Sequence, residues 1–373
     1  MKIVFIIDQL YLHGGIERVL SIKANYFSSI KENTVHIITT EQKQKEACYN
    51  FNSNIIFKDL GINYCREKSY FNPENLLKVP GHIFKLKKTL NKIKPDIAVV
   101  CSHSVDTYFV PFINKIIPKV KEFHYSKFIE IDKRQNPSSR FKKWFIQFAD
   151  YVETKYDALV VLNPDEASYY NSNNTKIIPN PLTFYPETVS KLDNPIAIAA
   201  GRIAPVKRYD VLIDIWALVH KTNKNWQLYI YGNGEENFIK NLQMKIDDLE
   251  LTQHVFLKGP TNHIQEKMLH SSLFLMTSDN ECFPLVLLEA QACGLPIISF
   301  DCPHGPRNII SDENGSLVNM KDLKVFSKEV LELMSNSNKR IQLGTNARNN
   351  ANNYSVEKIM PLWKDMFKGL INT

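Results

Sequence analysis

Short runs of apolar residues alternate with longer amphipathic stretches along nearly the whole chain. The first run, Lys2–Ile7, is apolar at almost every position, which is typical of a strand buried on both faces of a parallel sheet. Strands and helices in regular alternation predict a doubly wound α/β fold with right-handed crossovers. Ligands of such sheets bind beyond the carboxyl ends of the strands, so the residues after each apolar run are the candidates for function.

The expected elements fall into two series. In the first half the strands are Lys2–Ile7, Val35–Thr39, Ile55–Phe57, Ile97–Cys101, Val120–Phe123 and Ala158–Leu162, with helices at Leu76–Ile93 and Ser139–Lys155. In the second half they are Ile196–Ala200, Gln227–Tyr231, Val255–Leu257, Leu273–Met276 and Ile297–Ser299, with closing helices near Leu323–Met334 and Val356–Ile371.

A segment rich in proline and polar residues separates the two series. It runs from Ile178 to Pro195 without an apolar period, so it is interpreted as a linker between domains. A length of 373 residues also favours two domains. We therefore expect two Rossmann-like domains, at residues 1–182 and 183–373, with the last helix free to pack back on the first domain.

Composition places the chain among ordinary globular proteins. Hydrophobic residues make up 44% and charged residues 23%, which excludes a chain dominated by disorder. No apolar run approaches the roughly 18 residues of a membrane-spanning helix, and the six cysteines form no Cys-x-x-Cys pair. Met1 leads into a strand-like run without a signal-peptide pattern, so we expect a cytoplasmic protein with reduced cysteines.

Positive charge is concentrated in the first half of the chain. Residues 1–187 carry 26 Lys and Arg against 19 Asp and Glu, which accounts for the whole net charge of +7. Two basic blocks, Lys78–Lys94 and Lys115–Lys143, fit either a solvated helix face or an anionic membrane surface. Nucleic acid is disfavoured as a partner, because no binding motif accompanies the charge. The membrane contact expected in the first block comprises Phe84, Leu86, Leu90 and Ile93 beside Lys85, Lys87 and Lys88.

The stretch Ser278–Ile310 carries two glutamates, Glu281 and Glu289, eight positions apart. Glu281 lies in a polar, turn-like run, whereas Glu289 lies inside the apolar helix predicted at Leu285–Cys293. Because Glu289 is one turn from the start of this helix, it shares the helix end that lies next to Glu281. Spacing alone leaves a second interpretation open, in which both acids are solvated surface charges.

The start of the same helix offers a place for an anion. The backbone N–H groups of Phe283, Leu285 and Val286 have no partner within a helix that begins there. Two fixed carboxylates beside a cluster of donors suit a ligand with hydroxyl groups at both ends and phosphate between them. A nucleotide sugar is such a ligand.

A basic loop follows the strand predicted at Ile196–Ala200. It contains Arg202 and Lys207, five positions apart, with Pro205 between them. Arginine can grip phosphate oxygens in a bidentate manner and lysine adds a point charge, so the pair suits a diphosphate. A surface loop without a ligand is the alternative interpretation.

Other strand ends carry glycine or histidine. Gly14 and Gly15 follow the first strand, where a backbone without side chains lets a phosphate or sugar approach closely, and Gly259 ends a later strand. His124 and, as a weaker candidate, His103 each follow a strand of the first half. Each is also explained without a ligand, the glycines as turn residues and the histidines as structural hydrogen-bonding groups.

Together these motifs resemble the retaining glycosyltransferases of family 4. The signature of that family, Glu-x7-Glu followed by Gly-x-Pro, is matched by Glu281, Glu289, Gly294 and Pro296. One position departs from it, because Cys282 stands where the family usually has glycine. Two further patterns of the family, Gly-Arg-x4-Lys and Gly-Gly-x-Glu-Arg, are matched by Gly201, Arg202 and Lys207 and by Gly14, Gly15, Glu17 and Arg18.

The resemblance implies the fold called GT-B, in which two Rossmann-like domains face each other across a cleft. Arg202 and Lys207 would stabilise the leaving diphosphate. Glu281 would hold hydroxyl groups of the donor sugar, Glu289 would hold those of the ribose, and His124 would contact the transferred sugar. The implied catalytic residues are Glu281, His124, Arg202 and Lys207, and the implied donor site comprises Gly14, Gly15, Arg202, Lys207, Gly259, Glu281, Phe283, Pro284, Leu285 and Glu289.

The expected activity is transfer of a hexose or N-acetylhexosamine from a UDP-sugar to a lipid-linked glycan, with retention of configuration. The segment Asp301–Arg307 resembles the family members that act on bacterial surface polysaccharides, so we expect an enzyme at the inner face of the plasma membrane. No Asp-x-Asp motif is present, so a reaction without metal or cofactor is expected. The alternatives are another nucleotide-sugar enzyme, such as an epimerase, and a non-catalytic module that binds sugars or anionic surfaces.

Overall fold

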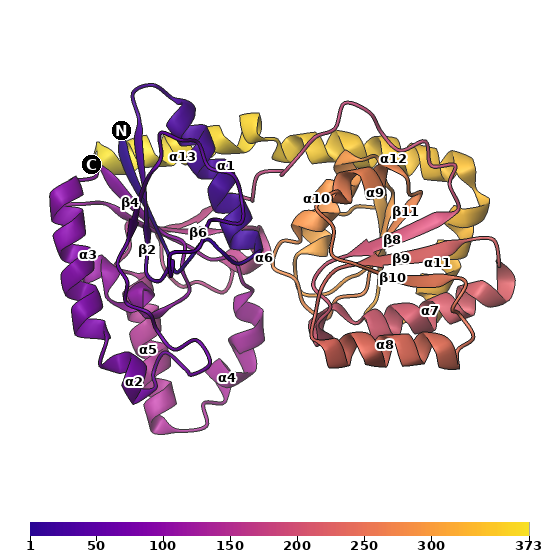
Figure 1. Ribbon diagram of the computed structural model, residues 1–373, viewed down its shortest axis with the longest axis horizontal. Helices are drawn as coiled ribbons and strands as arrows, with labels where there is room; N and C mark the ends of the chain where they lie inside the picture. The colour runs from indigo at the N-terminus through magenta and orange to yellow at the C-terminus, as the bar shows by residue number, and fades with distance from the viewer. Residues whose placement is uncertain (373) are drawn as a thin grey trace. The chain divides into compact units, whose positions relative to one another are not determined.

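The computed structural model describes residues 1–372 and divides the chain into two compact units. Unit 1 comprises Met1–Pro181 and the segment that begins at Val356, whereas unit 2 comprises Leu182–Ser355. Each unit is a parallel sheet with helices on both faces (Figure 1). The last helix therefore belongs to the first unit.

Within the described part of the chain, unit 1 is built on a seven-stranded parallel sheet of order β3-β2-β1-β4-β5-β6-β7. The order reverses between β1 and β4, which is where ligands bind in doubly wound sheets. All the strands predicted for this unit are present, and β7 is an addition. Their bounds are β1 (Lys2–Ile7), β2 (Thr34–Thr39), β3 (Ile56–Asp59), β4 (Ile97–Val100), β5 (Lys119–Glu122), β6 (Ala158–Val161) and β7 (Thr175–Ile177).

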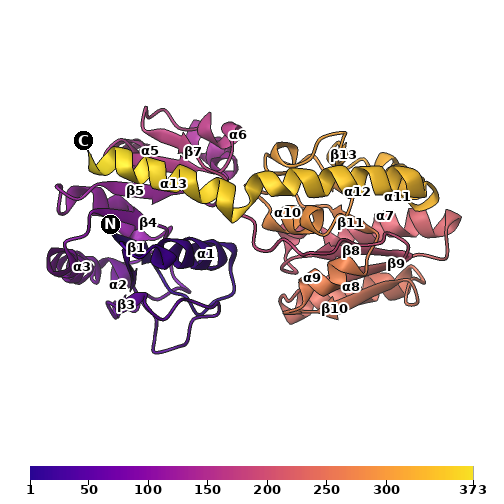
Figure 2. The ribbon, with the colours of Figure 1, turned by 90° about the horizontal axis from the view of Figure 1, so that it is seen from above.

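Helices cover both faces of this sheet. On one face α1 packs beside the C-terminal helix α13 (Figure 2). Phe27 and Phe367 stack there with ring centroids 5.2 Å apart. The other face is covered by α3 and α5. The helices of unit 1 are α1 (Gly15–Ser29), α2 (Pro73–Leu76), α3 (Val79–Ile93), α4 (Ile131–Gln135), α5 (Arg140–Glu153), α6 (Pro164–Ala167) and α13 (Val356–Ile371).

The helix predicted at Leu76–Ile93 is present as α3, but it begins three residues later, at Val79, and Leu76 is the last residue of the separate short helix α2. Pro80 lies in the first turn of α3. Proline has no N–H to donate to a preceding turn, so it is favoured in the first turn of a helix, as Pro80 is here.

Unit 2 has a six-stranded parallel sheet of order β10-β9-β8-β11-β12-β13, and its order reverses between β8 and β11. The predicted strands are all present, β13 is an addition, and α7, α8, α9 and α12 are helices for which no bounds were predicted. The strands are β8 (Ile196–Ala200), β9 (Gln227–Tyr231), β10 (Val255–Gly259), β11 (Leu273–Met276), β12 (Ile297–Phe300) and β13 (Gly315–Val318). The helices are α7 (Tyr209–Thr222), α8 (Glu236–Asp248), α9 (Ile264–Leu269), α10 (Leu285–Ala292), α11 (Leu323–Ser335) and α12 (Ser337–Ala351).

Helix α10 is the element that places the predicted acid Glu289. Nearly every residue of this helix is apolar, and Leu287, Leu288, Ala290 and Ala292 are fully buried. A helix that is apolar all round is buried all round. Glu289 is therefore inside unit 2 and not on a solvated face.

Candidate functional site

The basic loop and the first acid meet at the switch point of unit 2, where β8 and β11 end. Lys207 Nζ lies 2.5 Å from Glu281 Oε1, and the two side chains are 19% and 15% exposed. The loop is held to the end of β11, because the N–H of Asp279 donates to the carbonyl of Val206 and the hydroxyl of Thr277 donates to that of Lys207. The structure thus joins two predicted residues, 74 positions apart, in one half-buried ion pair.

Arg202 lies in the same loop and is exposed. Its guanidinium forms no ion pair or hydrogen bond with any residue that the structure describes. Gly201, just before it, has a φ of +152°, and a Cβ there would lie 3.2 Å from both Lys207 Cε and the Tyr209 hydroxyl. Glycine is therefore needed at this turn. Arg202, which follows it, is exposed and can contact a ligand.

Two glycines after β9 complete the floor of the basic loop. A Cβ on Gly232 would lie 1.9 Å from the carbonyl oxygen of Gly201, and one on Gly234 would lie 2.1 Å from that of Ile203. Gly259, at the end of β10, has a φ of +71°, and its carbonyl accepts a hydrogen bond from Gly232. Gly232 and Gly234 were not predicted to be site residues, because a Gly-x-Gly pair is too common to indicate a binding site by itself.

The turn after β12 fixes the backbone of Glu281. The N–H of Glu281 donates to the carbonyl of Pro303, and its carbonyl accepts from the N–H groups of His304 (2.9 Å) and Gly305 (2.7 Å). A Cβ on Gly305 would lie 2.5 Å from Pro284 Cδ, so glycine is required for this approach. Cys282, which replaces the glycine of the resembled family, has no positive φ and needs no special conformation.

The start of α10 presents free donors beside this pair. The cap residue is Pro284, and the N–H groups of Phe283, Leu285 and Val286 donate to no acceptor within residues 1–372. Uncapped N–H groups at a helix start, together with the helix dipole, attract an anion. The predicted arrangement of cations, carboxylate and backbone donors is therefore present in unit 2.

Glu289 lies one turn into α10 and is 3% exposed. Its Oε1 accepts a hydrogen bond of 2.7 Å from the hydroxyl of Thr183. Thr183 comes from the polar segment that we predicted to be only a linker, so sequence reasoning missed it. Residues 106 positions apart thus fix the orientation of this carboxylate.

In unit 1, Gly14 and Gly15 lie between β1 and α1. Gly14 is the N-cap of α1, and a Cβ there would lie 2.2 Å from Glu17 Oε2, whose side chain also accepts a hydrogen bond from Gln9. A Cβ on Gly15 would meet no atom within 4 Å. The helix start is thus open for a close backbone approach at Gly15, whereas the Glu17 carboxylate occupies the space beside Gly14.

His124 follows the end of β5 in unit 1 and is largely buried. Its Nε2 lies 2.8 Å from Glu122 Oε2, and its backbone N–H donates to His103 Nε2 at 3.4 Å. His103 is therefore a partner of His124. The structural interpretation of His103, as a hydrogen-bonding group, is the one that this geometry favours.

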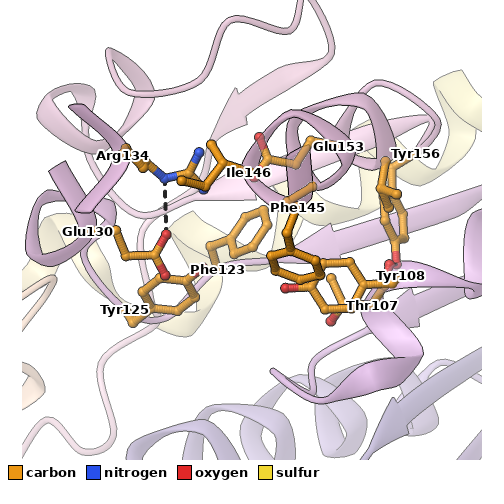
Figure 3. Close-up of a pocket in the computed structure, with 12 residues that line it drawn as sticks. Thr107, Tyr108, Phe123, Tyr125, Glu130, Arg134, Phe145, Ile146, Glu153 and Tyr156 are labelled. Atoms are coloured by element: carbon orange, nitrogen blue, oxygen red, sulfur yellow. Dashed lines mark hydrogen bonds and ion pairs between the residues drawn. The ribbon is translucent and has the colours of Figure 1, made fainter. Parts of the chain in front are cut away.

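Figure 3 shows a small pocket in unit 1, of about 100 Å³, beside the end of β5. The rings of Phe123 and Phe145 project into it, and the ion pair of Glu130 with Arg134, at 3.0 Å, lies at one side. Pockets that bind small molecules are typically about 300–1,000 Å³, so this one is too small for such a ligand. A nucleotide sugar does not fit there.

A larger pocket, of about 680 Å³, lies in unit 2 between the basic loop and α8. The apolar part of its lining includes Val206 and Phe238, and Arg208 in its wall is already paired with Asp210 and Asp279. None of the predicted donor residues lines it. The free cation and free N–H groups lie at the switch point and not in this pocket.

The membrane contact predicted on α3 is wrong for Leu86 and Leu90, although Phe84 of the same helix is 68% exposed. Leu86 and Leu90 are fully buried in the core of unit 1, and Lys85 donates to the carbonyl of Leu60. In α5, by contrast, Phe141 is 71% and Trp144 58% exposed. In the described residues, no helix combines the length and the apolar character needed to cross a bilayer.

Comparison with known proteins now adds to this geometry. Residues 184–350 match the family Glycosyl transferases group 1. The amylovoran biosynthesis glycosyltransferase AmsD of Erwinia amylovora is 31% identical over 221 residues, which are 56% of this chain and 62% of that protein. The lipopolysaccharide 1,6-galactosyltransferase of Salmonella typhimurium is 27% identical over 333 residues, 85% of each chain. The chain spans about three fifths of the length of the first curated relatives it matches.

A solved structure extends the likeness to both units. HepE of Anabaena, determined with UDP-glucose, superimposes with a TM-score of 0.76 over 99% of this chain and 100% of that one, at 18% identity. The fold is GT-B. At this identity the likeness shows the fold alone, while the group 1 match and the curated relatives support a glycosyltransferase.

Proposed function

We propose that the protein is a retaining glycosyltransferase that moves a hexose or N-acetylhexosamine from a UDP-sugar to a lipid-linked glycan. The observation that carries the proposal is the Lys207–Glu281 ion pair at the switch point of unit 2. It joins a phosphate-binding cation to a carboxylate that accepts hydrogen bonds from hydroxyl groups. The exposed Arg202 and the free donors of α10 lie in the adjoining segments.

The reaction breaks the bond between the anomeric carbon and the diphosphate oxygen, whose electron pair leaves with the diphosphate. A new bond forms from the acceptor hydroxyl oxygen to the anomeric carbon, and the hydroxyl proton passes to the departing diphosphate. Negative charge therefore grows on the diphosphate in the transition state. Arg202 and Lys207 stabilise that charge, which is the largest single contribution that such a site makes.

The ion pair explains how one site serves both parts of the donor. Without a ligand, Glu281 neutralises Lys207. A diphosphate carries more negative charge than one carboxylate, so it takes over Lys207 and leaves Glu281 to the sugar hydroxyl groups. Glu289, oriented by Thr183, receives the ribose hydroxyl groups. Gly14, Gly15 and His124 are also proposed to contact the donor.

The relatives support this choice of donor and pathway. HepE was determined with UDP-glucose, and AmsD is named for amylovoran biosynthesis. We therefore assign a UDP-sugar as the donor and synthesis of a cell-surface polysaccharide as the process.

A thermal-shift comparison of UDP, GDP and ADP tests nucleotide binding. We expect UDP to raise the melting temperature most, because a ligand at 100 times its dissociation constant stabilises the native state by about 2.7 kcal/mol. The control is the same titration of Arg202→Ala, in which the shift should shrink. No shift with any of the three nucleotides would rule out the proposed donor site.

Turnover is expected to need no divalent metal, because two cations already face the leaving group. Among the residues whose side chains the structure describes, no three His, Cys, Asp or Glu are grouped to hold an ion. Initial rates of UDP release in excess EDTA should equal those with magnesium or manganese. Activity that disappears in EDTA and returns with one of these metals would contradict the expectation.

We further propose that unit 1 docks on the inner face of the plasma membrane through α5. This helix carries Arg140, Lys142 and Lys143 beside the exposed rings of Phe141 and Trp144. Cations at the headgroup level with aromatic rings below them are the composition of an interfacial helix. The excess positive charge of residues 1–187 acts in the same direction.

Co-sedimentation with anionic and neutral liposomes measures this docking. Binding should require anionic lipid and fall as salt rises, since the Debye length shrinks from roughly 10 Å at 0.1 M to about 3 Å at 1 M. Changing Arg140, Lys142 and Lys143 to Ser should abolish it. The matched control, Lys87→Ser with Lys88→Ser and Lys92→Ser in α3, also removes three exposed charges and should not. If both variants lose liposome binding equally, the binding depends on the overall charge of the protein and not on α5.

A further inference from the structure

A row of charged side chains crosses the core of unit 1 behind the end of β5. Lys23 of α1 donates a hydrogen bond to Glu122 Oε1, and His124 Nε2 lies 2.8 Å from Glu122 Oε2. The side chains of Lys23, Glu122 and His124 are only 1%, 2% and 6% exposed. The ammonium of Lys23 also lies 4.4 Å from the ring centroid of Trp363 in α13.

The pair of charges fixes which nitrogen of His124 carries the proton. Burial acts to raise the pKa of Glu122, but the charge of Lys23 and the hydrogen bond from His124 outweigh it and lower that pKa to about 2. Burial also lowers the pKa of His124, so the imidazole is neutral at pH 7. An ionised carboxylate only accepts hydrogen bonds, so Nε2 must be protonated and Nδ1 must hold a lone pair.

The free nitrogen has no partner inside the protein. Nδ1 of His124 makes no hydrogen bond to any residue that the structure describes. The ring stands two residues past the end of β5, at the sheet edge where doubly wound domains bind ligands. A neutral imidazole with a fixed tautomer and a free Nδ1 is prepared to accept a hydrogen bond from a hydroxyl group.

A purely structural role accounts poorly for this arrangement. Buried ion pairs contribute little to stability, since apolar residues of similar volume are often as stabilising or more so. The side chains around Lys23 and Glu122, including Phe5 and Trp363, are those of an apolar core. Two charges kept in such a core at the base of a ligand-facing histidine point to a function for that histidine.

We propose that Lys23 and Glu122 are positioning residues, which hold His124 in the Nε2-protonated tautomer and present Nδ1 to a hydroxyl group of the transferred sugar. Trp363 covers the Lys23 ammonium, so helix α13 is part of the same support. This inference rests on the proposed function, because it names the group in unit 1 that meets the sugar. It assigns Lys23, Glu122 and Trp363, none of which touches the donor.

The direct test is the tautomer of His124 in the full-length protein, read by 15N NMR with labelled histidine and assigned by the signal lost in His124→Gln. In the wild type, Nε2 should appear protonated and Nδ1 unprotonated. In Glu122→Gln both nitrogens should shift toward a tautomer mixture, because an amide can donate as well as accept. The kcat for transfer should fall roughly 10- to 100-fold, the usual cost of losing a partner that orients a histidine, while KM for the donor stays nearly constant.

A double variant separates positioning from folding. Glu122→Gln leaves the Lys23 ammonium buried without a counter-charge and should lower Tm. Lys23→Met combined with Glu122→Gln removes both charges and should recover Tm, while kcat and the tautomer mixture do not recover. Recovery of kcat together with Tm would overturn the proposal, and so would an unchanged tautomer in Glu122→Gln.

The matched control uses an ion pair of the same types at the surface of unit 1. Lys68 and Glu74 are paired at 2.7 Å and about half exposed. Lys68→Met combined with Glu74→Gln should change neither kcat nor the His124 signals. If the wild type transfers no sugar, the proposed function fails. The NMR comparison still decides whether Lys23 and Glu122 set the tautomer.

Discussion

Glu281→Gln is expected to lower sugar transfer by on the order of 10²- to 10³-fold, the cost of removing one preorganised hydrogen-bonding group from a transition state. Its affinity for UDP should stay the same or rise slightly. In the unliganded protein the Glu281 carboxylate neutralises Lys207. The amide no longer competes with the diphosphate for that lysine, but it holds the sugar hydroxyl groups less well. Initial rates with the UDP-sugar and calorimetry with UDP measure the two effects separately.

Glu289→Gln is the matched comparison, because it makes the same chemical change in the same stretch of chain. Contacts to ribose exist before and during the reaction alike, so this variant should weaken UDP binding itself. Thr183 can still donate to the amide oxygen, so the fold of α10 should survive, which Tm verifies. The opposite pattern, with UDP affinity lost in Glu281→Gln, would mean that the two roles are exchanged.

Arg202→Ala and Lys207→Ala should each weaken UDP binding by about 1.5–3 kcal/mol, the range for a hydrogen bond to a charged group. Lys207→Ala should have the larger effect. Arg202 has no partner among the described residues and loses only its ligand contact. Removal of Lys207 also leaves the Glu281 carboxylate unpaired beside the diphosphate.

A double variant tests this explanation of the difference. Lys207→Ala combined with Glu281→Gln removes the repulsion as well as the attraction, so it should bind UDP more tightly than Lys207→Ala alone. Calorimetry with UDP in one buffer gives the affinities of the wild type, Arg202→Ala, Lys207→Ala and the double variant. If Arg202→Ala and Lys207→Ala both bind UDP as tightly as the wild type, the diphosphate does not bind at this loop.

The sequence predicts the central strands because a parallel strand inside a sheet needs a continuous apolar run. Gln227–Tyr231 and Leu273–Met276 coincide with β9 and β11 for this reason. The strands that were not predicted, β7 and β13, are the last strands at their sheet edges. Their sequences TKI and GSLV are partly exposed and show no apolar run.

Some residues of the candidate site were likewise predictable from the sequence, and others were not. The proximity of Lys207 and Glu281 was predictable, because each follows a strand and the two strands are neighbours in a doubly wound sheet. Thr183 was not predictable, because nothing in a polar segment indicates a partner 106 residues away. The burial of Leu86 and Leu90 was also hidden, since the lysines between them point to the other side of the same helix.

Transfer itself can be measured with the full-length protein, a panel of UDP-sugars, and octyl glycosides as substitutes for the lipid-linked acceptor. UDP release and the anomeric proton of the product are followed together in excess EDTA. The account predicts acceptor-dependent UDP release, a product with the anomeric configuration of the donor, and loss of both in Lys207→Ala. Bound UDP-sugar that is never cleaved, or a sugar that is isomerised without an acceptor, would contradict it.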